Sequence, residues 1–310
     1  MELKFKEYST LLPITFVCIL MVCLYLVEIK FGIEHLFFPE IAALSFGVLS
    51  RKKTWHIEKS ALLLSPVACA SLGVLLSRYF GTNFVTLSAC LIGGLILLRV
   101  FNTNITPSIS AGLFALLFNI NTFSYVLNIF VLSLVLLLMS QILERYEKKL
   151  DLNLCKISDR KIESKFGIIF IVMMYFGFSF VSQKYYIPEV LLPPIFVLAI
   201  EECSEIKLSN FFEILKFSIW IILVSYFAFG LKLFLGLGPL AIFLSILFSL
   251  FIFKISKLQA PPLLALALLP LILEGYSQFS PLATGFSFII IMLSLSIFRK
   301  TALNTKFAKL

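Results

Sequence analysis

Apolar residues lie along this chain in long segments separated by short polar stretches, and the segments have two lengths. Eight are close to the roughly 20 residues that an α-helix needs to cross the hydrocarbon core of a bilayer. The other four have only about 14–15 residues, which is too short to face lipid from end to end. The twelve segments are 11–28, 36–50, 61–80, 84–101, 106–120, 122–143, 166–183, 187–200, 211–231, 235–253, 260–274 and 278–298.

Each of the short segments opens on a proline. Proline lacks an N–H group and has a φ angle near that of a helix, so it suits the first turn of a helix, and it pushes its predecessor toward an extended conformation. We therefore expect four sharply started short helices near the centre of a helical bundle, where protein or a water-filled cavity covers their ends. The four sites are Phe38-Pro39-Glu40, Thr106-Pro107-Ser108, Ile187-Pro188-Glu189 and Ala260-Pro261-Pro262.

Each short segment lies between two long ones, which makes a three-segment unit that occurs four times. An odd number of crossings turns each unit upside down relative to the one before it, as in many transporters. Pro39-Glu40 and Pro188-Glu189 match most closely and have the same orientation. The pattern predicts an all-α polytopic membrane protein of about 12 transmembrane segments, in two six-segment halves that are each three plus three inverted. The expected parts are a first half (1–143), a cytoplasmic linker (144–165), a second half (166–300) and a cytoplasmic tail (301–310).

Composition and charge agree with a bilayer as the solvent. The chain is 60% apolar and only 14% charged, whereas soluble domains have about 25% charged residues. If the N-terminus is cytoplasmic and every segment crosses, four of the 26 Lys and Arg residues fall outside, as the positive-inside rule requires. These four are Lys30, Arg78, Lys184 and Lys232. We expect a plasma-membrane protein with both termini in the cytoplasm; re-entrant short segments are the alternative. The net charge of +9 then follows from topology and does not indicate nucleic acid.

Glu40 and Glu189 are the leading candidates for chemistry, because each follows a proline in the expected first turn of a short helix. Charged groups inside a bilayer are costly and usually functional. Each is therefore a candidate coupling group that takes up a proton or binds a cation. The alternative is a helix start at the membrane surface, where the helix dipole favours a carboxylate.

A polar turn at the second short site gives a second set of candidates. Its side chains either hydrogen-bond a small polar solute or cap the helix, and both interpretations stay open. Arg99, next to this turn, either balances the charge of an anion or extends toward the headgroups. The turn contains Asn102, Asn104, Thr106, Ser108 and Ser110, and Gln259 is the expected counterpart in the fourth unit.

The sequence holds no pattern of a cofactor, metal or catalytic site. Its six cysteines lack paired spacing and its two histidines, His35 and His56, lie in loops, so we expect no disulfide framework and no metal site. We find no Ser/His/Asp set and no phosphate-binding loop, and we do not expect an enzyme.

The stretch Leu87–Met139 resembles the HPP family of integral membrane proteins, in which a short polar turn with His-Pro-Pro opens a helix rich in small residues. The matching features are Gly93-Gly94, the turn 102–106, and the helix from Pro107 to Gly112. Residues 36–80 are similar to the preceding part of that family, and 187–298 to a second, diverged copy. The resemblance implies membrane transport, with nitrite proposed as a substrate of some members. Neither Thr106-Pro107-Ser108 nor Ala260-Pro261-Pro262 has the histidine.

These observations predict a secondary transporter, or permease, for a small polar or ionic solute, working by alternating access and driven by a gradient such as that of protons. The solute's charge, anion or cation, stays open, as does assembly into a homo-oligomer. A membrane subunit of a larger complex and a passive channel are the alternatives.

Overall fold

The structure is a computed structural model that describes residues 2–50, 58–149, 165–185, 188–205, 211–256, 260–273 and 275–304. Every regular element in these ranges is helical, which confirms the expected all-α class. The α-helices are α1 (Glu2–Phe31), α2 (Glu40–Leu49), α3 (Lys59–Phe80), α4 (Phe84–Val100), α5 (Pro107–Leu117), α6 (Phe123–Lys149), α7 (Lys165–Tyr185), α8 (Pro193–Glu205), α9 (Phe211–Leu235), α10 (Pro239–Ser256), α11 (Pro262–Ile272) and α12 (Ser280–Asn304).

Six helices in the described ranges are long and apolar enough to cross a membrane: α3, α6, α7, α9, α10 and α12. Their outer faces carry large apolar side chains in the open, such as Phe212 and Phe234, which are 78% and 88% exposed. A soluble protein rarely shows apolar surface on this scale, whereas lipid tails cover it at no cost. The fold is therefore compatible with a membrane-embedded protein.

Three short helices begin where the prolines predict, and the fourth begins later. Pro39 and Pro261 precede α2 and α11, and Pro107 is the first residue of α5. The expected helix at Pro188 is only a single 3₁₀ turn, η1 (Pro188–Leu191), and α8 starts at Pro193. The reason is Pro193 itself, because a proline disfavours the helical conformation of its predecessor and suits the first turn of a helix.

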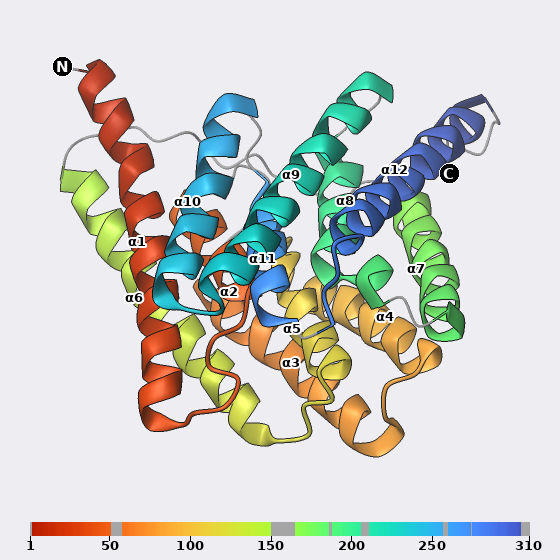
Figure 1. Cartoon of the computed structure of the whole chain (residues 1–310), viewed down its shortest axis with the longest axis horizontal. Helices are drawn as coiled ribbons and strands as arrows, with labels where there is room; N and C mark the ends of the chain where they lie inside the picture. The colour runs from red at the N-terminus through yellow and green to blue at the C-terminus, as the bar shows by residue number, and fades with distance from the viewer. Residues whose placement is uncertain are drawn as a thin grey trace.

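The four short helices form a closed ring in the bundle interior. Along the ring α2 packs against α5, α5 against α8, α8 against α11, and α11 against α2 (Figure 1). All ten side chains of α2 are buried, as are those of 107–116 in α5, 193–201 in α8 and 262–271 in α11. A helix that is apolar on all faces is stable only when other helices enclose it. The longer helices enclose this ring.

The surrounding helices make two similar sets of contacts. In the first, α3 packs against α4, α5 and α6; in the second, α9 packs against α10, α11 and α12. Outside these two sets, α1 packs against α10 of the second set and α7 packs against α4 of the first. The first and last described helices, α1 and α12, place the two chain ends on the same side of the bundle (Figure 1).

The backbones of α3 and α5 approach each other so closely that only glycine fits. A Cβ atom added at Gly73 would lie 2.1 Å from the Gly112 carbonyl oxygen, and one added at Gly112 would lie 2.5 Å from the Cys69 carbonyl oxygen. Small residues at such crossings are the usual means of holding membrane helices together, since dispersion forces act only at short range. This crossing fixes one wall of the ring.

Candidate functional site

The ring has two different ends. At the first, which we call the cavity end, α8 starts where α5 and α11 finish. α2 starts there too, because the Phe38 ring, just before α2, lies 6.2 Å from the ring of Phe114 in the last turn of α5. At the second, which we call the latch end, the start of α5 meets the last turns of α8 through a hydrogen bond between Thr106 and Glu201.

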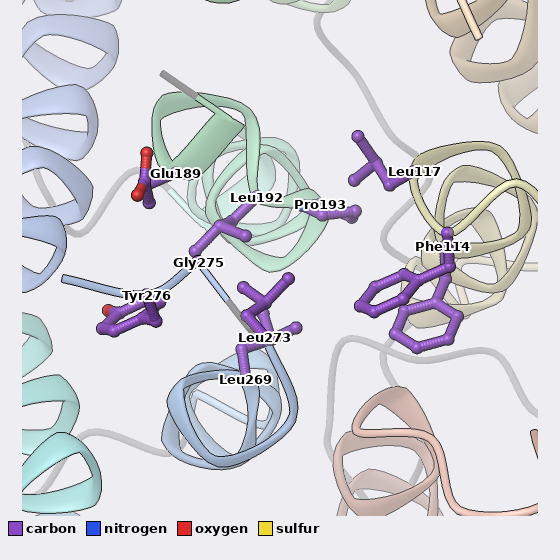
Figure 2. Close-up of a pocket in the computed structure, with 10 residues that line it drawn as sticks. Phe114, Leu117, Glu189, Leu192, Pro193, Leu269, Leu273, Gly275 and Tyr276 are labelled. Atoms are coloured by element: carbon purple, nitrogen blue, oxygen red, sulfur yellow. The ribbon is translucent and has the colours of Figure 1, made fainter. Parts of the chain in front are cut away.

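A cavity of ≈ 90 Å³ opens between the helix ends at the cavity end (Figure 2). α5, η1, α8, α11 and the loop after α11 all contribute to its wall. The lining residues are Phe114, Leu117, Phe118, Glu189, Leu192, Pro193, Leu269, Leu273, Gly275 and Tyr276. Glu189 and Tyr276 lie on one side of the cavity and Phe114 and Leu117 on the other (Figure 2). Its wall is therefore polar at one end and apolar at the other.

Glu189 is half-buried in η1, and a serine holds it in place. Ser280, the first residue of α12, donates a hydrogen bond of 2.8 Å to a carboxylate oxygen of Glu189. The Ser280 hydroxyl in turn accepts a bond of 2.9 Å from the backbone N–H of Ser277. A carboxylate has about four acceptor positions, so this contact leaves most of them available to a ligand.

Tyr276, in the loop between α11 and α12, lines the cavity on the same side as Glu189. Its side chain is buried, and its hydroxyl lies near those of Ser225 on α9 and Thr284 on α12. Burial raises the pKa of the Tyr276 hydroxyl, the two neighbouring hydroxyls oppose this rise, and the charge of Glu189 adds to it. The hydroxyl therefore stays neutral and keeps its proton to donate.

Glu40, the first residue of α2, lies at the cavity end but does not line the cavity. Its side chain is 2% exposed, and neither carboxylate oxygen has a hydrogen-bond partner in the described part of the chain. Glu40 and Glu189 thus lie at the same end of the ring, but Glu40 is enclosed by protein whereas Glu189 lines the cavity. Glu40 is in the first turn of its helix as expected, whereas Glu189 lies in the 3₁₀ turn that precedes α8.

The polar turn before α5 separates into two groups. Thr106 donates a hydrogen bond of 2.5 Å to the carboxylate of the buried Glu201, and the Ser108 hydroxyl lies 3.1 Å from that of Ser65 on α3. Both bonds are buried at the latch end and cross between helices. Ser110 is also buried.

The remaining candidates of this turn lie nearer the surface. Asn102 is exposed, has a φ angle of 47° and bonds through its N–H to the Arg99 carbonyl, a left-handed turn that asparagine tolerates better than most residues. Asn104 is half-buried and Arg99 is exposed in the last turn of α4. Gln259 lies outside the described residues.

Sequence reasoning missed Glu201, Tyr276 and Ser280. Glu201 directly follows the expected short segment 187–200, which ends too early because α8 continues to Glu205. A carboxylate directly after the apolar residues of a short helix could have indicated that Glu201 is buried in the same helix. Tyr276 and Ser280 gave no such signal, because neither belongs to a pattern in the sequence and only the fold brings them near Glu189.

Comparisons with known proteins offer no relative from which a function can be transferred. No family model, no curated protein and no solved structure matches the chain. The similarity to the HPP family stays a prediction from the residues of the second and fourth units. The site itself has to carry the functional argument.

Proposed function

We propose that the chain is a membrane permease that moves a small polar or ionic solute by alternating access through the ring of short helices. One observation carries the proposal: the ring is hollow at one end and closed by buried hydrogen bonds at the other. Such an asymmetry is what one state of an alternating-access cycle requires, since a permease opens to one side at a time.

The proposal includes twelve crossings in two six-helix halves, each three plus three inverted. The similar contact sets around α3 and α9 support a duplication, because α3 and α9 are six helices apart in the chain. The central position of the four short helices supports it as well, since repeat-built transporters place their sites where interrupted helices meet. The HPP resemblance points in the same direction.

In this mechanism the two halves rock against each other around the ring. With the N-terminus in the cytoplasm, the cavity end faces outward and the latch end inward. Opening to the cytoplasm breaks the Thr106–Glu201 and Ser65–Ser108 contacts at the latch end. The same rotation brings the ends of α5, α8 and α11 together and closes the cavity.

We assign the coupling role to Glu40. A charged carboxylate without a partner is very costly in a buried apolar site, whereas the protonated form costs much less. Binding and release of a proton at Glu40 therefore change the relative stability of the two states if rocking alters its access to water. Glu189 binds the solute in this scheme.

The test is uptake into vesicles that contain only the purified chain. We expect saturable uptake that depends on a pH gradient, and we expect Glu40→Gln to remove the dependence on that gradient while uptake down a solute gradient persists. Glu213→Gln, a matched change at an exposed residue of α9, leaves coupling intact.

Three results would each count against the proposal. Absence of uptake by the chain alone, with activity only beside a second protein, would make it a subunit of a larger complex. Flux that never saturates would make it a channel. Unchanged coupling in Glu40→Gln would remove Glu40 from the mechanism.

A further inference from the structure

We propose that the cavity binds a small organic ammonium ion with a short apolar tail. This inference deepens the proposed function, because it names the class of solute for the site at the cavity end. It rests on the arrangement of polar and apolar groups in the cavity wall.

The charge of the wall favours a cation. Glu189 is the one acidic residue among the ten that line the cavity, and none of the ten is a lysine, arginine or histidine. Within the described ranges no Lys or Arg forms an ion pair with it, and its contact is the hydroxyl of Ser280. The ammonium group of Lys232 donates a hydrogen bond to the backbone carbonyl of Leu273, which lines the cavity. Lys232 itself does not line the cavity.

The carboxylate of the wall lies on one side of the cavity. Glu189 on η1 and Tyr276 on the loop after α11 are both on this side, and the Tyr276 hydroxyl points away from the other lining residues (Figure 2). An ammonium group has three donors, and the Glu189 carboxylate has acceptor positions left over beside its bond to Ser280. A charge-assisted bond of this kind is stronger than one between neutral groups.

The far end of the cavity accepts only apolar atoms. Phe114 and Phe118 stack there with ring centroids 4.1 Å apart, and Leu117 lies beside them (Figure 2). Leu192, Pro193, Leu269 and Leu273 line the space between the two ends. A ligand that satisfies both ends therefore has its charge at one terminus and an apolar tail at the other.

The size of the cavity limits the tail. An apolar cavity of about 150 Å³ holds benzene. A cavity of ≈ 90 Å³ therefore encloses about four heavy atoms, the size of propylammonium. Larger ammonium ions fit only if they extend through the open side.

Binding to the purified full chain tests the inference without any need for transport. Dissociation constants of propylammonium, 1-propanol and propionate are measured by saturation-transfer NMR. We expect propylammonium to bind best, and Glu189→Gln to weaken it by about tenfold or more while leaving propanol unchanged. Glu213→Gln, which removes the same charge far from the cavity, leaves all three constants unchanged.

Tail length provides a second readout. From methylammonium to propylammonium, affinity rises by about fourfold for each added methylene, and it stops rising once the cavity is full. Leu117→Ala enlarges the apolar end, and the preferred tail becomes longer.

Tighter binding of propanol or propionate, or an unchanged propylammonium constant in Glu189→Gln, would overturn the ammonium site. The permease proposal fails separately: amine binding without uptake removes transport and keeps the site. Uptake of another solute without amine binding keeps transport and removes the site.

Discussion

At the scale of single residues, the contact between Thr106 and Glu201 is the feature most open to test. It joins the start of α5 to the last turns of α8, 95 positions apart in the chain, and both side chains are buried. A hydrogen bond to a buried carboxylate is worth about 1.5–3 kcal/mol. It is therefore strong enough to bias which end of the ring is closed.

Replacing Thr106 by Val keeps the side-chain shape and removes the donor, so we expect the latch end to open more often. Amide hydrogen exchange in the first turn of α5 should speed up by roughly tenfold or more, since exchange reports the local opening equilibrium. Thr106→Ser retains a hydroxyl and should stay near the original rate. Equal rates in all three proteins would show that the bond does not hold this end closed.

At the scale of helices, the positions of the elements were largely predictable and their partnerships were not. Segment length and the prolines at 39, 107 and 261 marked the helices, because proline restricts the backbone locally. Two prolines precede the body of α8, Pro188 and Pro193, and the helix starts at the later one, Pro193. Which polar residues meet across the ring depends on packing between distant segments, and one sequence does not contain that information.

The crossing of α3 and α5 carries a prediction at the same scale. Gly112→Ala places a Cβ atom 2.5 Å from the Cys69 carbonyl oxygen, so the helices must move apart. We expect a loss of about 1–3 kcal/mol in the free energy of unfolding, measured by thermal or denaturant unfolding in detergent.

Gly177→Ala in α7 is the matched control, because no atom lies within 4 Å of the added Cβ. It should leave stability unchanged or slightly raised, since alanine favours the helix. A Gly112→Ala protein as stable as the control would mean that the tight crossing is not present in the membrane.

At the scale of the whole molecule, the architecture surrounds a ring that contains two buried carboxylates with an apolar exterior. Buried carboxylates at the two ends of the ring, Glu40 and Glu201, lie among helices that are otherwise almost entirely apolar. Ionisable groups in an apolar interior cost stability and usually mark functional positions. The proposed transport cycle therefore requires that water reach the ring at some stage.

Thiol labelling tests this most directly. In a protein with its native cysteines replaced, single cysteines are placed in the middle of the short helices, at Ala43, Ala111, Ala199 or Ala267. Matched cysteines at Leu223 and Leu247 occupy exposed positions in the middle of α9 and α10. Each protein in vesicles is treated with a water-soluble thiol reagent that does not cross the bilayer. We predict that the ring cysteines react although they are buried, and that the two outer ones do not; inert ring cysteines would contradict a solute path through the ring.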